Sequence, residues 1–317
     1  MKKNIAVVGC GHWGKNLVRN FWELGVLVAV CDPNRDLAQR YADEYSVMDL
    51  SFSDILNDSS IEGVVLAVPA VMHCSMALAA MGKGKSVFVE KPIAMNVAEA
   101  KLMISSANKN KVQLMVGHLL QYHPVFVALR KLTELGQLGN LQYLYSNRLS
   151  FGKIRSEEDV IWSFAPHDIS MILSLVGQEV IAVKTESSAI LQGGIADTAT
   201  IHMEFDSGVK AHILVSWLHP CKEQKLVVIG DAGMAVFDDT KPWCEKLAVY
   251  RHKVDITESQ AELSKSNVEY LVVEESEPLR NECKHFIEVI SGRVRPLTDC
   301  DEGLSVLNVL SAASLPD

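Results

Sequence analysis

The sequence contains no apolar run of about 20 residues, the length that a membrane-spanning helix needs. Its first residues, Met1-Lys2-Lys3, lead directly into a predicted strand and not into the apolar core of a signal peptide. We therefore predict a cytoplasmic protein with no membrane partner.

The sequence also lacks a cluster of Lys and Arg residues. Its formal net charge is -9, whereas a nucleic-acid-binding face needs excess positive charge to neutralise phosphates. The charge pattern therefore argues against a nucleic-acid partner, although single basic residues can still bind a small anionic substrate.

The seven cysteines are scattered along the chain, and no two of them form a C-x-x-C motif. An odd number of isolated cysteines is typical of a reduced intracellular protein and not of a disulfide framework. No His, Cys and carboxylate residues have the spacing of a metal site, so we predict that no metal is bound.

The chain has 317 residues, 48% of them hydrophobic, which is more than one hydrophobic core usually supports. Residues 1–121 alternate short apolar strands with amphipathic helices, a pattern that predicts a doubly wound parallel sheet, the Rossmann fold. Residues 122–317 are richer in long strands joined by turns, so we predict an α+β domain with a large, mainly antiparallel open sheet. The polar stretch 255–267 is predicted to be an exposed loop or a short helix.

A large sheet with helices on one face leaves its other face uncovered. Burying that face against another copy of the chain would remove apolar surface from water. We therefore expect a homodimer or a homotetramer.

A glycine-rich loop, Gly9-Cys10-Gly11-His12-Trp13-Gly14, follows a predicted strand and precedes a predicted helix. In a dinucleotide-binding loop the first glycine allows the turn, the second lets the backbone approach the pyrophosphate, and the third lets helix and strand pack closely. A G-x-G-x-x-G motif alone is weak evidence, because a glycine-rich turn occurs in other α/β proteins.

A second predicted strand ends at Asp32, which lies 18 positions after Gly14 (32 minus 14). A carboxylate at this place accepts hydrogen bonds from the ribose hydroxyls and repels a 2′-phosphate. The spacing therefore predicts NAD, and not NADP, as the cofactor.

The triplet Glu90-Lys91-Pro92 follows the apolar run Ser86 to Val89. Ligands of open α/β sheets bind outside the carboxyl ends of the strands, so a lysine just after a strand points toward the bound nucleotide. Pro92 favours an extended Lys91 and prevents the strand from continuing into a helix. The alternative is an ordinary surface lysine.

Oxidation of an alcohol requires a proton to leave oxygen while hydride leaves carbon, with the reacting atoms about 3 to 3.5 Å apart. A lysine beside a positively charged nicotinamide should have its pKa shifted toward neutrality, which suits a base or an alkoxide stabiliser. His167 needs little adjustment for the same task, although it also fits a helix cap or a core histidine. Either residue can be the base.

Several motifs occur in the order of one known family: the glycine loop, Asp32-Pro33, Val68-Pro69 followed by His73, Gly84-Lys85 through Pro92, Gly117 followed by Pro124, and Glu277-Pro278-Leu279 with His285-Phe286. Together they resemble the Gfo/Idh/MocA family of NAD(P)-dependent sugar oxidoreductases over essentially the whole chain. The Glu-Lys-Pro context is the most specific of these motifs.

Within that family, the stretches Gly11 to Asn16 and Ser163 to Ile169 are similar to sugar-nucleotide dehydrogenases. This resemblance implies NAD-dependent oxidation of the C3 hydroxyl of UDP-N-acetylglucosamine to a 3-keto sugar. It also implies a downstream aminotransferase that consumes the product, as in lipopolysaccharide or lipid A biosynthesis.

The resemblance assigns site residues as well. It makes Lys91 and His167 catalytic, and Ser163 stands where many members have an aspartate four residues before this histidine, so that either Asp168 orients His167 or Lys91 and His167 act alone. The cofactor pocket would comprise Gly9, Gly11, His12, Trp13, Gly14, Asp32, Pro69, His73, Glu90, Lys91 and Trp162. The substrate site would comprise Lys91, Gln121, Tyr122, Arg148, Arg155, Ser163 and His167, with the two arginines as candidate ligands of the diphosphate.

Three other functions fit the same sequence. They are a keto-sugar reductase, a free-sugar dehydrogenase and a non-catalytic regulator that senses a dinucleotide. The joint presence of Lys91 and His167 argues against the regulator, because function depends on the site and not on the fold.

Overall fold

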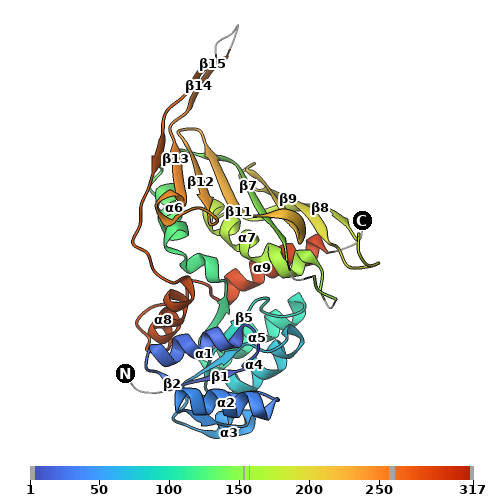
Figure 1. The fold of residues 1–317 in the computed structure, drawn as a ribbon, viewed down its shortest axis with the longest axis vertical. Helices are drawn as coiled ribbons and strands as arrows, with labels where there is room; N and C mark the ends of the chain where they lie inside the picture. The colour runs from blue at the N-terminus through green and yellow to red at the C-terminus, as the bar shows by residue number, and fades with distance from the viewer. Residues whose placement is uncertain (1–3, 153, 157, 257–260, 315–317) are drawn as a thin grey trace. The chain divides into compact units, whose positions relative to one another are not determined.

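The computed structural model describes residues 4–314 except 153, 157 and 257–260. The chain divides into two compact units, Met1–Tyr122 with Glu277–Leu307, and His123–Ser276 with Asn308–Asp317 (Figure 1). The predicted domain boundary between residues 121 and 122 lies one residue from the first break. We predicted that residues 277–307 belong to the second domain, but in the structure they are part of the first unit.

The first unit contains a six-stranded parallel sheet with the order β3-β2-β1-β4-β5-β6. Its strands are β1 (Ile5–Val8), β2 (Leu27–Cys31), β3 (Met48–Asp49), β4 (Gly63–Leu66), β5 (Ser86–Glu90) and β6 (Leu114–Gly117). Its helices include α1 (Gly14–Glu23), α2 (Arg35–Tyr45), α3 (Phe52–Asn57), α4 (His73–Gly82) and α5 (Val97–Asn110), with short 3-10 turns η1 (Ala70–Met72) and η2 (Leu119–Tyr122). The strand order reverses between β1 and β4, which is where nucleotides bind in such sheets.

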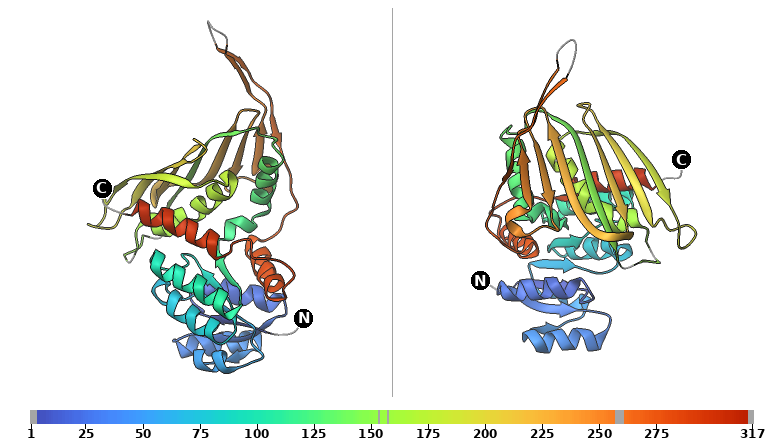
Figure 2. Two further views of the ribbon diagram at one scale, coloured as in Figure 1. Left: turned by 180° about the vertical axis from the view of Figure 1, so that it is seen from behind. Right: turned by 45° about the horizontal axis from the view of Figure 1, so that its top comes forward.

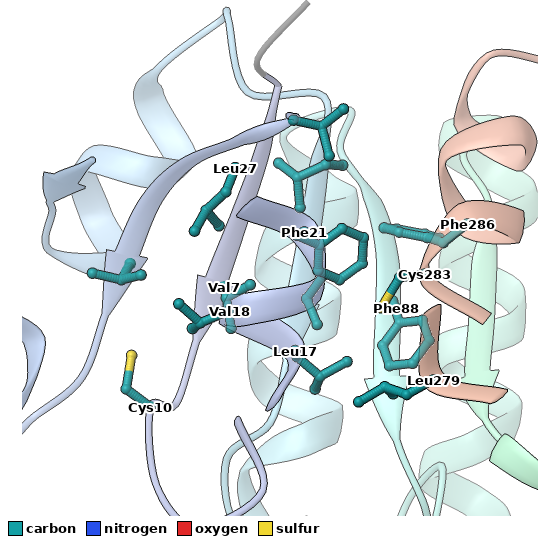
Figure 3. Close-up of a cluster of buried hydrophobic side chains, with 14 of the residues drawn as sticks. Val7, Cys10, Leu17, Val18, Phe21, Leu27, Phe88, Leu279, Cys283 and Phe286 are labelled. Atoms are coloured by element: carbon teal, nitrogen blue, oxygen red, sulfur yellow. The ribbon is translucent and has the colours of Figure 1, made fainter. Parts of the chain in front are cut away.

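The core of this unit explains why residues 277–307 belong to it. Strands β1, β4, β5 and β6 are buried along their whole length, as expected for a parallel sheet covered on both faces. Helix α8 (Pro278–Ile290) adds Leu279, Cys283 and Phe286 to the same cluster (Figure 3). The Phe286 ring packs edge-on against Phe88, with ring centroids 5.6 Å apart. Local patterns predict α8 correctly but do not specify its packing partner.

The second unit contains an eight-stranded sheet with the order β16-β13-β12-β11-β7-β10-β9-β8. Its strands are β7 (Leu141–Phe151), β8 (Val180–Ser188), β9 (Thr198–Phe205), β10 (Lys210–Ser216), β11 (Leu218–Gly230), β12 (Met234–Asp238), β13 (Leu247–Tyr250) and β16 (Val268–Tyr270), with the short turn η3 (Trp243–Glu245). Only the β7–β10 pair is parallel among the described ladders of this sheet. The predicted fold class, a parallel sheet followed by a large, mainly antiparallel one, is confirmed.

Helices α6 (Pro124–Glu134) and α7 (Val160–Val176) pack against this sheet (Figure 2). Helix α9 (Cys300–Ala313) contains the third break, between Leu307 and Asn308. On β7, the buried Ser146 hydrogen-bonds to Asp168 of α7, so the alternate residues Tyr143 and Tyr145 face the opposite side. They are half-buried there.

Strands β14 (Lys253–Ile256) and β15 (Ala261–Ser264) pair as a separate antiparallel ribbon that extends away from the large sheet (Figure 1). We predicted an exposed loop or a short helix over 255–267; this was wrong for the residues in β14 and β15, whereas residues 265–267 are a loop. In the part of the chain that the structure describes, every helix is too short or too polar to cross a membrane.

Candidate active site

The glycine loop connects β1 to α1 and has the geometry of a pyrophosphate cradle. Gly9 has a φ of +93°, and a Cβ there would lie 2.5 Å from the carbonyl oxygen of Ala67. A Cβ at Gly14 would collide with the carbonyl oxygen of Gly9. In contrast, a Cβ at Gly11 would have nothing within 4 Å, so the backbone there is open to a ligand. The loop precedes the N-terminus of α1, where free backbone N–H groups attract phosphate.

Asp32 follows β2 and is held beside the glycine loop. Its Oδ2 accepts a hydrogen bond from the Cys10 N–H at 2.7 Å, and its Oδ1 accepts one from the Asn34 N–H at 2.8 Å. The side chain is half-exposed, and each carboxylate oxygen can accept a second hydrogen bond. Asp32 is therefore fixed in orientation and still available to ribose hydroxyls.

Trp13 links the glycine loop to the Glu-Lys-Pro triplet. Its indole Nε1–H donates to Oε1 of Glu90 at 2.5 Å, and the Lys91 N–H donates to Oε2 of the same carboxylate at 3.3 Å. Glu90 is 9% exposed, and its Oε2 would lie 2.9 Å from a Cβ at Gly117. Burial raises the pKa of Glu90, while the Trp13 hydrogen bond and the positive charge of Lys91 act in the opposite direction. The hydrogen bond between Trp13 and Glu90 was not predicted from the sequence.

His73 ties the segment after β4 to the segment after β5. Its Nδ1 lies 2.8 Å from the carbonyl oxygen of Pro92, and its Nε2 lies 3.0 Å from the carbonyl oxygen of Val68. The side chain is 1% exposed, and burial lowers the pKa of its imidazole. Pro69, the next residue after Val68, is exposed. His73 is therefore a buried residue that joins these two segments, and it does not lie on an open surface.

Helix α7 carries the predicted acid-base histidine. Asp159 caps the helix by accepting a hydrogen bond from the Trp162 N–H at 3.0 Å. Ser163 and His167 lie four residues apart and therefore share one face of the helix. Trp162 and His167 are half-buried, whereas Ser163 is buried.

Asp168 has a different role from the one considered for it. Its carboxylate accepts hydrogen bonds from Arg148 Nε at 2.6 Å, from Arg148 Nη2 at 3.2 Å and from Ser146 Oγ at 2.5 Å. Both charged side chains are largely buried, at 12% exposed for Arg148 and 1% for Asp168. This pair joins β7 to α7, and it commits the Arg148 guanidinium to Asp168 instead of to a diphosphate.

Three other predicted substrate residues lie in different surroundings. Arg155 forms an ion pair with Glu158, and its side chain is 42% exposed, so it remains accessible to an anion. Gln121 is 2% exposed. Tyr122 is also buried, and its hydroxyl lies 2.9 Å from Thr298 Oγ1. Burial raises the pKa of Tyr122 well above its usual value, so this residue belongs to the core of the first unit.

The first unit thus brings together most of the predicted cofactor residues. Those that lie near the carboxyl ends of β1, β2, β4 and β5 are Gly9, Gly11, His12, Trp13, Gly14, Asp32, Pro69, His73, Glu90 and Lys91. The second unit carries Trp162 and His167, so their pairing with Lys91 stays a prediction. Among the described residues, no group of three or more His, Cys, Asp and Glu side chains is arranged to hold a metal ion.

One buried acid near this site was missed by the sequence analysis. Glu282 of α8 is 1% exposed and follows the apolar spacing of Leu279, Cys283 and Phe286. An acidic residue on the buried face of an amphipathic helix was the only signal in the sequence.

Comparison with known proteins agrees with this geometry. Residues 3–118 match the oxidoreductase family with an NAD-binding Rossmann fold, and residues 126–236 match the Gfo/Idh/MocA C-terminal domain. The chain is 30% identical over 211 residues to the UDP-N-acetylglucosamine 3-dehydrogenase of Acidithiobacillus ferrooxidans, an alignment that covers 66% of each chain. It is 26% identical over 245 residues to the NAD-dependent scyllo-inositol 2-dehydrogenase of Bacillus subtilis, covering 72% of this chain and 71% of the relative.

A solved structure supports the fold. The UDP-N-acetylglucosamine 3-dehydrogenase of A. ferrooxidans superimposes with a TM-score of 0.86 at 23% identity, covering 99% of this chain and 97% of the other. The predicted family and the predicted cofactor are confirmed by these matches. The chain belongs to the Gfo/Idh/MocA family of oxidoreductases, with NAD as its cofactor.

Proposed function

We propose that the protein is an NAD-dependent dehydrogenase that oxidises the C3 hydroxyl of UDP-N-acetylglucosamine to the 3-keto sugar. The observation that carries the proposal is the hydrogen bond between Trp13 of the glycine loop and Glu90 of the Glu-Lys-Pro triplet. The Trp13–Glu90 hydrogen bond fixes Lys91 next to the loop that receives the cofactor. The relative from A. ferrooxidans supports the choice of substrate.

The residues of the first unit fit NAD. The open backbone at Gly11 and the N-terminus of α1 would hold the pyrophosphate, and Asp32 would accept hydrogen bonds from the adenosine ribose. Pro69 and Glu90 would border the nicotinamide end. When bound, NAD accepts the hydride that leaves the sugar carbon.

The protein's own groups would move the proton. His167 would take the proton from the sugar hydroxyl, while the Lys91 ammonium would orient the oxygen and stabilise its developing negative charge. The reverse assignment of these two roles is the alternative. In both cases the C3–H bond breaks toward the cofactor and the O–H proton goes to a side chain, which leaves a ketone.

A second candidate is the oxidation of a free cyclitol. The inositol dehydrogenase of B. subtilis aligns with a larger share of this chain than the sugar-nucleotide enzyme does, although at lower identity. A cyclitol has no diphosphate, so it would make no use of the accessible Arg155. The same site run in reverse would reduce a keto-sugar nucleotide.

A substrate panel distinguishes these candidates. We would measure kcat/KM with NAD for UDP-N-acetylglucosamine, N-acetylglucosamine, UDP-glucose and myo-inositol, using wild type and Lys91→Met. The proposal predicts the highest value for UDP-N-acetylglucosamine, a product lighter by two hydrogens, and no turnover by the variant. Preferred turnover of myo-inositol would replace the proposal with the cyclitol enzyme, and NAD binding without turnover of any compound would favour a sensing role.

The proposal extends to partners and location. The product is a keto sugar that an aminotransferase would consume, in the cytoplasm where NAD and UDP-sugars are held.

On the large sheet, rings from three neighbouring strands lie side by side, with His212 stacked on Tyr145 at 5.3 Å and His202 5.8 Å from His212. This face would pack on a second copy. Light scattering should give twice or four times the chain mass of 34.9 kDa, and Tyr145→Glu should give the chain mass.

A further inference from the structure

Glu282 is a carboxyl group in the core that the proposed chemistry does not use. It lies on the buried face of α8, is 1% exposed, and neither of its carboxyl oxygens has a hydrogen-bond partner among the described residues. An ionised carboxylate in such surroundings is very costly, so a buried acid of this kind normally stays protonated.

Glu282 lies one helical turn before Phe286, which packs on Phe88 of β5, and Glu90 lies two residues after Phe88 on the same side of that strand. The titratable groups that interact electrostatically with Glu282 are Glu90 of β5, Tyr122 of η2, Glu302 of α9 and Cys283 of α8 itself. Burial, followed by the negative charges of Glu90 and Glu302, raises the pKa of Glu282 well above its usual value. Burial and the charges of Glu282 and Glu90 likewise raise the pKa of the Cys283 thiol.

The neighbours of Glu282 differ from it in their hydrogen bonds. Glu302 Oε2 lies 2.6 Å from Nδ1 of the buried His118, which also faces Glu90. Tyr122 is bonded to Thr298, and Glu90 accepts hydrogen bonds from Trp13 and from the Lys91 N–H. Glu282 is thus the neutral acid of the cluster, and Glu90 is the carboxylate with two donors.

We propose that Glu282 is a positioning residue that holds a proton beside the Glu90 carboxylate, so that the buried pair carries a single negative charge behind Lys91. The inference rests on the proposed function only where it assigns a role to Lys91. With one charge in the pair, the Glu90 carboxylate keeps its bond to Trp13 and stays fixed over Gly117. A second charge would repel it and would displace the triplet that borders the nicotinamide.

The sign of the stability effect follows from the raised pKa of Glu282. The native state retains this proton when the unfolded chain has lost it, so the contribution is fully present below the unfolded pKa and is lost as pH rises through the folded pKa. A glutamine at this position cannot ionise. The Tm of Glu282→Gln should therefore rise relative to wild type as pH increases.

The first test is the infrared carbonyl stretch of a protonated carboxylic acid at neutral pH. We expect wild type and Glu288→Gln, a half-buried control on the same helix, to show a band that Glu282→Gln lacks. If the spectra of wild type and Glu282→Gln do not differ in this band, Glu282 is ionised and the inference is overturned.

The second test is NAD affinity, measured by calorimetry without any sugar. Glu282→Gln is neutral at every pH and should bind NAD within about threefold of wild type at neutral pH. At the pH at which the wild-type infrared band is lost, wild type should bind NAD about tenfold more weakly than this variant, because the pair then carries two negative charges. The difference should vanish in a Glu90→Gln background, because the two side chains act as a pair. Equal affinity of wild type and Glu282→Gln at that pH, or a difference that persists with Glu90→Gln, would contradict the pairing.

The third test separates a positioning role from a purely structural one. As pH rises through the loss of the infrared band, the KM of wild type for NAD should rise and its kcat should fall relative to those of Glu282→Gln. Parallel pH profiles of wild type and Glu282→Gln would show that Glu282 has only a structural role. Since the first two tests need no substrate, an error in the proposed sugar would leave their outcome unaffected.

Discussion

Replacing Asp32 with alanine is expected to shift the ratio of kcat/KM for NAD to that for NADP by about 100-fold or more toward NADP. Asp32 is held by the Cys10 and Asn34 N–H groups at the end of β2, so its charge is fixed where the adenosine ribose would lie. The change removes two effects that both favour NAD.

The magnitude follows from these two effects. Hydrogen bonds from ribose hydroxyls to a carboxylate contribute about 1.5 to 3 kcal/mol. Repulsion between this carboxylate and a 2′-phosphate about 5 Å away adds about 3 kcal/mol at an effective dielectric constant of about 20, and salt reduces it. A conservative total of about 3 kcal/mol corresponds to about 100-fold.

The assay is steady-state kinetics with both cofactors, with Asp36→Ala as a control that removes the same charge from the exposed first turn of α2. The control should leave the cofactor ratio within about twofold. Asp32→Ala should also lower the Tm, because the buried Cys10 N–H loses its acceptor. A change in the cofactor ratio below about fivefold in Asp32→Ala would refute the reasoning.

Three further predictions follow from named contacts. Trp13→Phe removes the indole donor to Glu90 and should weaken NAD binding about tenfold by calorimetry, from a loss of about 1.5 kcal/mol; unchanged affinity would show that this bond does not shape the pocket. Arg148→Met leaves the Asp168 carboxylate buried and unpaired and should lower the free energy of unfolding in urea by about 3 kcal/mol or more, with recovery on adding Asp168→Asn; a loss below about 1 kcal/mol would contradict it. For Asp239, burial raises the pKa, but hydrogen bonds with His123 and Lys246 outweigh burial and lower the pKa to about 2. The stabilisation of about 2 kcal/mol is present above the unfolded pKa and is lost as pH falls through about 2, so Asp239→Asn should destabilise the protein at pH 7 and converge with wild type in acid, as urea unfolding at both pH values would show; equal stability of the two proteins at pH 7 would contradict this.

Local patterns predicted the secondary structure well where amphipathicity and turn residues agree. The helix Pro278–Ile290, for example, begins at a proline, which is favoured in the first turn of a helix, and ends just before Gly292, so its bounds follow from the local sequence. The β14–β15 ribbon was missed although both strands alternate polar and apolar residues, because each strand has only 4 residues and lies in a mainly polar stretch. The packing of α8 in the first unit was missed because periodicity marks a buried face but not the element that covers it.

The same division applies to the site. The glycine loop, Asp32 and the Glu-Lys-Pro triplet are contiguous motifs, and their chemistry could be predicted from spacing alone. The partners of Arg148 and Tyr122 could not, because Asp168 and Thr298 meet them only through tertiary packing. An arginine in the sequence does not reveal whether its guanidinium is free for a phosphate or committed to a buried carboxylate.

The central claim is that hydride leaves C3 of UDP-N-acetylglucosamine for NAD. The most direct measurement mixes the protein with NAD and UDP-N-acetylglucosamine carrying deuterium at C3, and determines the mass of the reduced cofactor and of the sugar product. We predict deuterium in the reduced cofactor and a UDP-linked 3-keto sugar without it, both absent with Lys91→Met. Reduced cofactor without deuterium, or a product that keeps the label, would contradict the account.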